Sequence, residues 1–164
     1  IVAGYKYFFG SQKPTGLAIT KSNLPSYELS TIDSAMHGGY VVYESKSKPK
    51  IEIFATGTEV ELAVQVADFY RDIGARVISM PCESIFKEQD KTYKNKVLLK
   101  NPILKIAIEA SNDNLWYKYV GENGIIVNVI DYQFSGSGTE VYQKAGFNTG
   151  DIVSKINKAL KALE

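Results

Sequence analysis

The amino-acid sequence predicts an α/β protein whose mostly parallel sheet is covered by helices on both faces. From about residue 39 onward, short apolar runs of strand type alternate with amphipathic helical patterns, and the connections between them are short. The strand-like runs are almost continuously apolar, which is typical of strands buried on both faces of a parallel sheet. We therefore expect one α/β unit, with right-handed crossovers between its parallel strands.

The composition is that of one globular domain: the chain has 164 residues, of which 45% are hydrophobic and 23% are charged. The net charge is +1 and both signs are mixed along the chain, which argues against nucleic-acid or membrane-surface binding. No apolar run approaches the roughly 20 residues of a membrane span. A single cysteine, Cys82, excludes an internal disulfide and agrees with a reducing, cytoplasmic compartment. One histidine and one cysteine also cannot form a typical zinc site.

The first two expected strands are residues 39–45 ("GYVVYES") and residues 51–57 ("IEIFATG"), separated by a basic loop that we expect to be solvated. Thr58 and Glu61 then have the spacing of a capping box at a helix start. The helix that follows has apolar residues at i, i+3, i+4 and i+7, and Gly74 is expected to end it.

The same alternation continues to the end of the chain. Pro81 stops a strand over residues 75–80, and a more polar helix is predicted from Glu83 to about Lys94. A strand over 103–110 precedes a short helix in which Trp116 is expected to be a core anchor. A strand over 124–132 and helices over 139–145 and 151–163 complete the unit.

The first 25 residues differ from the rest. They predict a helix, a turn and an apolar strand over 17–20 that has no evident partner, and the chain opens on Ile1 without an initiator methionine or a signal-peptide pattern. We therefore expect this chain to be a piece of a longer protein.

Candidate binding residues follow the strands, because ligands of open α/β sheets bind beyond the carboxyl ends of the strands. Residues 56–59 ("TGTE") begin a helix, where free N–H groups favour anions, but Glu59 adds a negative charge. Neither "TGTE" nor "SGSGTE" (135–140) matches a phosphate loop or a dinucleotide fingerprint, so capping and tight turns are the favoured interpretation. The other strand ends are 81–83, 109–111 and Asp131-Tyr132.

No complete catalytic group is evident in the sequence. Glu83 and Glu109 would form a general acid/base pair only if their strand ends were neighbours, and the start of a helix already explains Glu83. Nucleophilic catalysis would require His37 to meet Cys82. We expect His37 to be a loop residue and Cys82 a small buried hydrophobe.

Taken in order, several segments resemble transketolases. "PTGLAITKSNLP" resembles the end of the thiamine-pyrimidine-binding domain of that family. "GGYVVYE", "IFATGTEVELAVQVA", "ARVISMPCESIFKEQD", "IAIEASNDNLWYKYVG" and "GSGTEVYQKAGFNTGDI" resemble successive parts of its C-terminal domain. The resemblance covers essentially the whole chain.

The resemblance implies a three-layer α/β/α fold with a five-stranded, mostly parallel sheet and one antiparallel strand, a role that we assign to Gly39–Ser45. It divides the chain into the tail of the preceding domain (1–25), a linker (26–38) and the C-terminal domain (39–164). Family members are homodimers that use thiamine diphosphate and Mg²⁺ or Ca²⁺ to move two-carbon ketol units between sugar phosphates, as in the pentose phosphate pathway. The family's metal and diphosphate motif, its cofactor-activating glutamate and its catalytic histidines are absent here. We therefore expect this chain to bind no cofactor or metal itself and to depend on upstream domains for turnover.

The resemblance also suggests a role for Lys21. The family usually has an arginine at this position, which helps to hold the terminal phosphate of the substrate. Lysine binds phosphate as a point charge and lacks the planar fork of arginine. We expect Lys21 to contact substrate phosphate in the intact enzyme. Two other hypotheses remain: a free-standing α/β module that binds a small anion or nucleotide at "TGTE" and "EAS", and a purely structural segment.

Overall fold

The computed structural model describes residues 1–11, 13–130 and 135–163, so the predicted strand end at Asp131-Tyr132 lies outside the described residues. Five strands form one sheet in the order β1-β3-β2-β4-β5. The strands are β1 (Tyr40–Glu44), β2 (Ile51–Ala55), β3 (Ala75–Ser79), β4 (Leu104–Ile108) and β5 (Ile125–Val127). All five lie within the strands expected from the sequence.

Strand pairing confirms a mostly parallel sheet with one antiparallel strand. β2 pairs in parallel with β3 and β4, and β4 pairs in parallel with β5. β1 is the antiparallel strand at the edge, where Tyr40 lies opposite Ser79. The loop of residues 45–50 joins β1 to β2 without a helix, whereas the chain passes through at least one helix between each parallel strand and the next strand in sequence.

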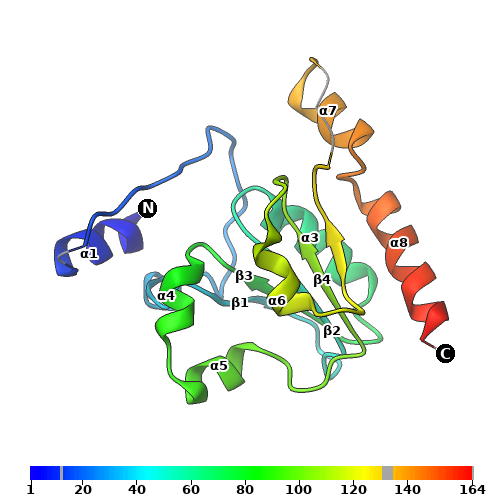
Figure 1. Cartoon of the computed structure of the whole chain (residues 1–164), viewed down its shortest axis with the longest axis horizontal. Helices are drawn as coiled ribbons and strands as arrows, with labels where there is room; N and C mark the ends of the chain where they lie inside the picture. Colours follow the sequence, from blue (N-terminus) through cyan, green and yellow to red (C-terminus); the bar gives the residue numbers. More distant parts are fainter. Residues whose placement is uncertain (12, 131–134, 164) are drawn as a thin grey trace.

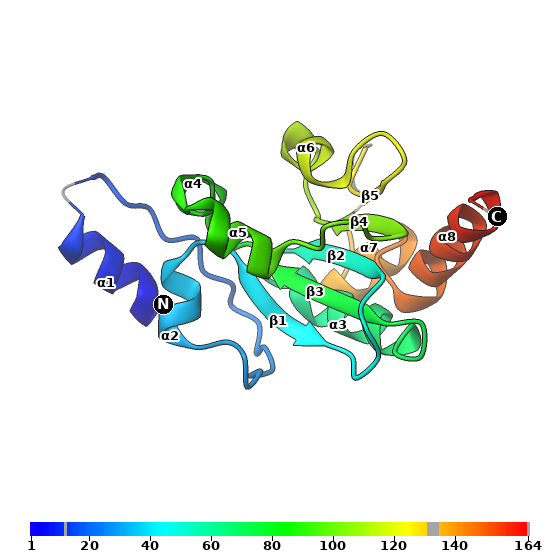
Figure 2. The same ribbon diagram turned by 90° about the horizontal axis from the view of Figure 1, so that it is seen from below.

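Helices cover both faces of the sheet, as Figure 2 shows most clearly. One face carries α3 (Glu59–Phe69), α7 (Gly138–Lys144) and α8 (Thr149–Ala162). The other carries α4 (Glu83–Glu88), α5 (Lys91–Val97), the 3₁₀ turn η1 (Asn114–Trp116) and α6 (Tyr117–Val120). α1 (Val2–Gly10) and α2 (Ile32–Met36) lie side by side at the amino-terminal side of the molecule (Figures 1 and 2).

The sheet divides the hydrophobic core into two clusters. Alternating side chains such as Ile53 and Ile106 pack under α3 and α8, while Phe54 and Ala107 face α4 to α6. Trp116 is 2% exposed and belongs to the second cluster, which confirms the prediction that it is a core anchor. Strands with side chains buried on both faces are what the continuous apolar runs indicated.

Two sequence-based predictions about the first half of the chain are wrong. Residues 17–20 form no strand: they are exposed, and none of the described strands pairs with them. Thr58 and Glu61 form no capping box. Thr58 already has helical backbone angles, and its Oγ1 donates a hydrogen bond to Glu59 Oε1 instead.

The helix predicted from Glu83 to Lys94 is in fact two helices. α4 ends at Glu88, and Asp90 starts α5 by accepting a hydrogen bond from the Tyr93 backbone N–H at 2.7 Å. Asp90 is a residue type that caps helices, so the sequence did contain a signal for a second helix start. The apolar spacing over residues 83–94 is too weak to show where the first helix ends. A capping box does form at Ser137 and Glu140, which confirms the capping interpretation of "SGSGTE".

Gly74 closes the turn between α3 and β3 with φ of +97°, and its N–H donates to the Tyr70 carbonyl. A Cβ at this position would lie 2.1 Å from the carbonyl oxygen of Lys48, which is backbone and cannot move aside cheaply. We expect Gly74→Ala to lower the free energy of unfolding by about 2–4 kcal/mol, measured by urea denaturation. Gly10→Ala is the control, since its Cβ meets no atom within 4 Å; an equal loss in both variants would contradict the steric explanation.

Candidate functional site

The carboxyl edge of the sheet has a switch point between β2 and β4. From β2 the chain crosses through α3 to β3 on one side, and from β3 it crosses through α4 and α5 to β4 on the other side. The loop 56–58 after β2 and the loop 109–113 after β4 therefore meet at this crevice. In α/β folds this is the usual position for a ligand.

The crevice is filled by side chains of the protein itself. Glu59, the first residue of α3, is only 5% exposed. Its Oε1 accepts hydrogen bonds from Thr58 Oγ1 at 2.9 Å and from the Tyr142 hydroxyl of α7 at 2.5 Å. Tyr142 in turn packs against Phe147, with ring centroids 5.4 Å apart.

Glu109 lies at the end of β4 beside this pair. Its Oε2 is buried without a hydrogen-bond partner. Burial raises the pKa of Glu109 to about 7, and the carboxylates of Glu59 and Asp113 contribute in the same direction. A carboxyl group with this pKa exchanges its proton near neutrality. The negative charges of the crevice also disfavour an anion at "TGTE".

The structure does not bring Glu83 and Glu109 together, so the acid/base pair that the sequence left as an unfavoured possibility does not form. Glu83 forms an ion pair with Lys118 and accepts a hydrogen bond from the Tyr119 hydroxyl at 3.2 Å. The hydrogen bond from Lys118 lowers the pKa of Glu83, and burial raises that of Tyr119. The carboxylates that help to raise the pKa of Glu109 are instead those of Glu59 and Asp113.

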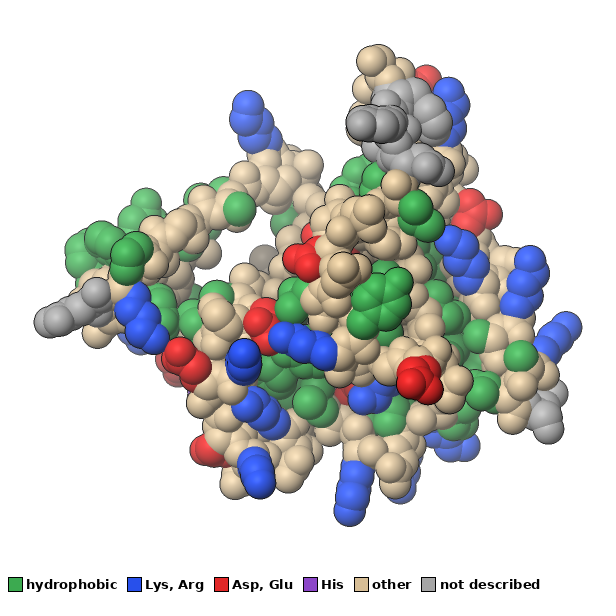
Figure 3. Space-filling view, in the orientation of Figure 1, with side chains coloured by type: hydrophobic (Ala, Val, Ile, Leu, Met, Phe, Trp, Pro, Cys, Tyr) green, Lys and Arg blue, Asp and Glu red, His purple; other side chains and the backbone are tan. Residues whose placement is uncertain are grey.

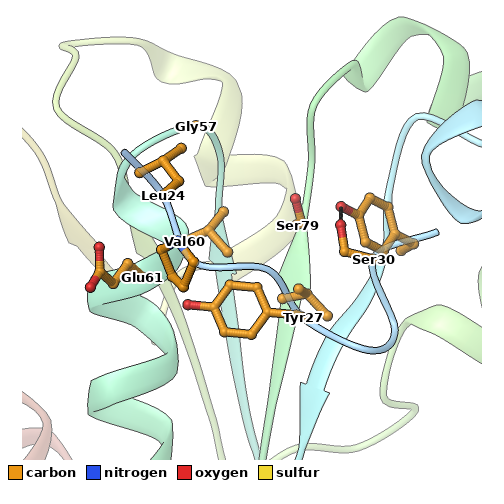
Figure 4. Close-up of a pocket in the computed structure, with 10 residues that line it drawn as sticks. Leu24, Tyr27, Ser30, Gly57, Val60, Glu61 and Ser79 are labelled. Carbon is orange, nitrogen blue, oxygen red and sulfur yellow. Dashed lines mark hydrogen bonds between the residues drawn. The ribbon is translucent and has the colours of Figure 1, made fainter. Parts of the chain in front are cut away.

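A cavity of about 200 Å³ lies beside the crevice, at the ends of β2 and β3. Figure 4 shows how residues 24–30 run across its mouth, with Leu24 and Tyr27 facing Val60 of α3. The Ser30 hydroxyl and the Tyr40 hydroxyl are hydrogen bonded at 2.8 Å. The cavity is lined by Leu24, Pro25, Tyr27, Ser30, Tyr40, Val42, Gly57, Val60, Glu61 and Ser79. Among the described lining residues, Glu61 is the one charged side chain, so the cavity suits a neutral group better than a phosphate.

Lys21 belongs to the segment of residues 13–31 between α1 and α2, part of which arches away from the sheet (Figure 1). Its side chain is exposed and has no hydrogen bond or ion pair to the part of the chain that the structure describes. The Thr20 hydroxyl accepts a hydrogen bond from the Ser22 backbone N–H at 3.1 Å, next to Lys21.

Hydrophobic side chains gather over α1 at the left of Figure 3, and Phe9 is 81% exposed.

His37 and Cys82 have separate partners. His37 stacks on Tyr93 with ring centroids 4.2 Å apart, and its Nδ1 lies 2.8 Å from the Asp33 carbonyl oxygen. Cys82 is half-buried, less than predicted, and its Sγ lies 3.3 Å from Ser84 Oγ. No nucleophile–base pair is formed by these two residues.

The described residues contain no group of three or more His, Cys, Asp or Glu side chains suited to hold a metal ion. Within the same residues, no helix is both long and apolar enough to cross a membrane.

Sequence reasoning missed the contact between Tyr142 and Glu59, which are 83 positions apart. The expectation that binding residues follow the carboxyl ends of the strands did select both acids as candidates, because Glu59 and Glu109 each follow a parallel strand. It could not indicate that α7 returns to the same crevice.

The family model for the transketolase-like C-terminal domain matches residues 38–148. Transketolase from Buchnera aphidicola (Acyrthosiphon pisum strain) is 34% identical over 98% of this chain, and Escherichia coli transketolase 2 is 36% identical over 90%. These alignments cover 25% and 23% of the relatives, so the chain spans about a quarter of the length of the curated relatives it matches.

Solved structures agree with the family match. An arginine-to-leucine variant of Pichia stipitis transketolase aligns with 97% of this chain at a TM-score of 0.85 and 29% identity, covering 23% of that protein. The same enzyme in complex with sedoheptulose-7-phosphate aligns with 97% of this chain at a TM-score of 0.83 and 29% identity. A split-gene transketolase, solved as an inactive β4 tetramer, has the same fold at a TM-score of 0.63, with 18% identity over 88% of this chain and 49% of that one. The five-stranded mixed sheet, the matched segment and these relatives together show that the chain belongs to the transketolase family and corresponds to its C-terminal portion.

Proposed function

We propose that this chain is the C-terminal segment of a thiamine diphosphate-dependent transketolase that transfers two-carbon ketol units between sugar phosphates. The observation that supports this most directly is the family match over residues 38–148 together with structural alignment of 97% of the chain to a transketolase. The cofactor supplies the carbanion chemistry when bound. We assign the cofactor and its Mg²⁺ or Ca²⁺ to the upstream part of the intact enzyme, because this sequence lacks the metal and diphosphate motif of the family.

Within such an enzyme, residues 1–25 would complete the preceding domain, 26–38 would be a linker, and 39–164 would be the C-terminal domain. The exposed apolar side chains of the first part support this division. Val2, Phe9 and Ile19 are 58%, 81% and 58% exposed, which is costly unless another domain or subunit covers them. We propose that they pack against the upstream domains of a homodimeric enzyme. The single free thiol agrees with a cytoplasmic location.

The free-standing binding module is the weaker alternative. Its proposed anion would lie at the ends of β2 and β4, where Glu59 and Glu109 place negative charge and Tyr142 fills the space. A chimaera tests the main proposal: this chain replaces the matching segment of E. coli transketolase 2, and ketol transfer is assayed with thiamine diphosphate and Mg²⁺. We expect turnover by the chimaera and none by the chain alone. A chimaera that folds and dimerises but is inactive would contradict the proposal.

We further propose that Lys21 contacts the phosphate of the substrate. Its ammonium group is exposed and has no partner among the described residues, which supports this role. A relative solved with a phosphorylated ketose supports the choice of ligand. The contact would be a charge-assisted hydrogen bond to one phosphate oxygen.

In the chimaera, we expect Lys21→Ala to raise KM for a phosphorylated aldose acceptor by about tenfold or more, because one charged hydrogen bond is lost. KM for the same aldose without phosphate should not change. Lys21→Arg should keep the low KM, and Lys46→Ala, which removes another exposed lysine, is the matched control. Equal effects of Lys21→Ala on both acceptors would reject the phosphate contact.

A further inference from the structure

The cavity at the ends of β2 and β3 has one polar side and one apolar side. Tyr40 and Ser79 contribute hydroxyl groups from the sheet, and Ser30 contributes a third from the segment that crosses the mouth. In Figure 4, Ser79 lies toward Ser30, whereas Leu24 and Val60 lie on the opposite side. The cavity therefore suits a molecule that is apolar on one side and forms hydrogen bonds on the other.

The Ser79 hydroxyl has no hydrogen-bond partner in the part of the chain that the structure describes. Only 6% of this residue is exposed, and it lies in the wall of the cavity. A polar group this deeply buried is unfavourable without a partner. The backbone of β3 already pairs with strands on both sides, so the side-chain hydroxyl is the group that is left over. This observation points to a polar molecule in the cavity that bonds to Ser79 Oγ.

A second hydroxyl hydrogen is also free to point into the cavity. The Ser30 and Tyr40 hydroxyls share one hydrogen bond at 2.8 Å, and whichever of them donates, the other keeps its own hydrogen. Together with Ser79, the polar side thus offers two hydroxyl donors whose oxygens can also accept. A primary amide matches this set, because it combines a carbonyl acceptor with an NH₂ donor.

The volume and charge of the cavity limit the ligand further. The cavity has about 200 Å³. An apolar cavity of about 150 Å³ can hold one benzene molecule, whereas drug-sized ligands occupy about 300–1,000 Å³. One six-membered ring with a small substituent therefore fits. An anion would be repelled by Glu61, and a charge of either sign would lose its hydration beside neutral hydroxyls. Figure 4 shows the Glu61 carboxylate directed away from Ser79.

We propose that this cavity is a binding site for a small neutral ring compound that carries an amide or a similar carbonyl group. The ring lies against Leu24 and Val60, and the amide lies between Ser79 and the hydrogen-bonded pair of Ser30 and Tyr40. Residues 24–30 lie over the bound molecule. The proposal rests on the cavity and not on the proposed ketol transfer, so either one can fail without the other.

The test uses benzamide, benzoate and benzylamine, which have nearly the same shape and are neutral, negative and positive at pH 7. Binding to this chain is followed by the backbone amide shifts in NMR titrations. We expect benzamide to bind with a Kd of about 1 mM and to shift the amides of Gly57, Val60 and Ser79. Both ions should bind at least about tenfold more weakly.

Three results of this titration would overturn the proposal. They are the absence of a saturable shift with benzamide up to about 20 mM, shifts confined to residues outside the cavity, and equal binding of all three compounds. Tighter binding of benzylamine would also overturn it, because Glu61 would then select a cation.

Ser79→Ala should weaken benzamide binding by about fivefold, because one hydrogen bond to the amide is lost. Binding of toluene, which has no polar group, should change by less than about twofold, and this comparison separates the hydrogen bond from a change in cavity shape. Ser154→Ala, at an exposed serine of α8, is the matched control. Unchanged benzamide affinity in Ser79→Ala would refute the contact. If that variant does not fold, the three-compound comparison on the wild-type chain still decides.

Discussion

Replacing Glu52 by alanine is expected to lower the free energy of unfolding by about 3 kcal/mol, because it leaves a partly buried backbone N–H without a partner and opens a cavity. Glu52 lies in the central strand β2 and is fully buried. Its Oε1 accepts a hydrogen bond from the Leu99 backbone N–H at 2.5 Å. That contact ties the end of α5 and the loop before β4 to the sheet.

The negative charge of Glu52 is expected to contribute less to stability than the hydrogen bond that its Oε1 accepts. Its Oε2 lies 3.6 Å from Lys105 Nζ, close enough for an ion pair but too long for a hydrogen bond. Burial raises the pKa of Glu52, while Leu99 and Lys105 lower it in part. Because the folded-state pKa is raised, the contribution of this group to stability is fully present below the ordinary glutamate pKa and is lost as the pH rises through the folded value.

Glu52→Gln separates the two effects, since it keeps an acceptor for Leu99 and removes the charge. We expect it to change stability at pH 7 by less than about 1 kcal/mol. Urea denaturation followed by circular dichroism measures both variants, with Glu122→Ala as the surface control. If Glu52→Gln lost as much as Glu52→Ala, the ion pair with Lys105 would be the dominant interaction instead.

Phe54→Ala is expected to lower the free energy of unfolding by about 4 kcal/mol, the usual cost of removing a fully buried aromatic ring. Phe54 is 0% exposed and lies between Tyr119 and Trp116, with ring centroids at 5.3 Å and 6.3 Å. The cavity would open beside the chain's one tryptophan, so we also expect a red shift of its fluorescence in the folded variant.

Phe54→Leu should cost less, about 1–2 kcal/mol, because most of the buried volume is kept. Phe69→Ala is the matched control: that ring is 62% exposed and its removal should change stability by less than about 0.5 kcal/mol. Equal losses at Phe54 and Phe69 would show that the cluster around Trp116 does not stabilise the domain.

Most of the domain fold could be predicted from the sequence because the signals are local. The strands β2, β3 and β4 are nearly continuous apolar runs, and α8 buries Ile152 and Ile156 at helical spacing. The segment 17–20 shows where local signals fail: it has the residues of a strand, but a strand also needs a hydrogen-bonding neighbour, and none is described beside it. The capping-box prediction for Thr58 is wrong for a similar reason, since the Thr58 hydroxyl donates its hydrogen bond to the neighbouring Glu59 carboxylate.

The candidate site was predictable only in part. The position of Glu59 and Glu109 after parallel strands pointed to both acids. The one pairing considered for Glu109 was with Glu83, which was not favoured and which the structure pairs with Lys118. Which strand ends are neighbours depends on the strand order, and the periodicity of the sequence does not encode that order. The role of Lys21 stays a prediction, since it concerns a substrate and residues outside this chain.

The sequence by itself determined the alternation of strands and helices, the two-sided burial of the sheet and the resemblance to transketolases. These properties depend on residues close together in the chain. Only the tertiary structure decided that Glu59, Glu109 and Tyr142 meet at one crevice and that α7 covers it. The physical reason is that burial and electrostatic coupling arise between groups brought together by packing, so they exist only once the strands are ordered and the helices docked.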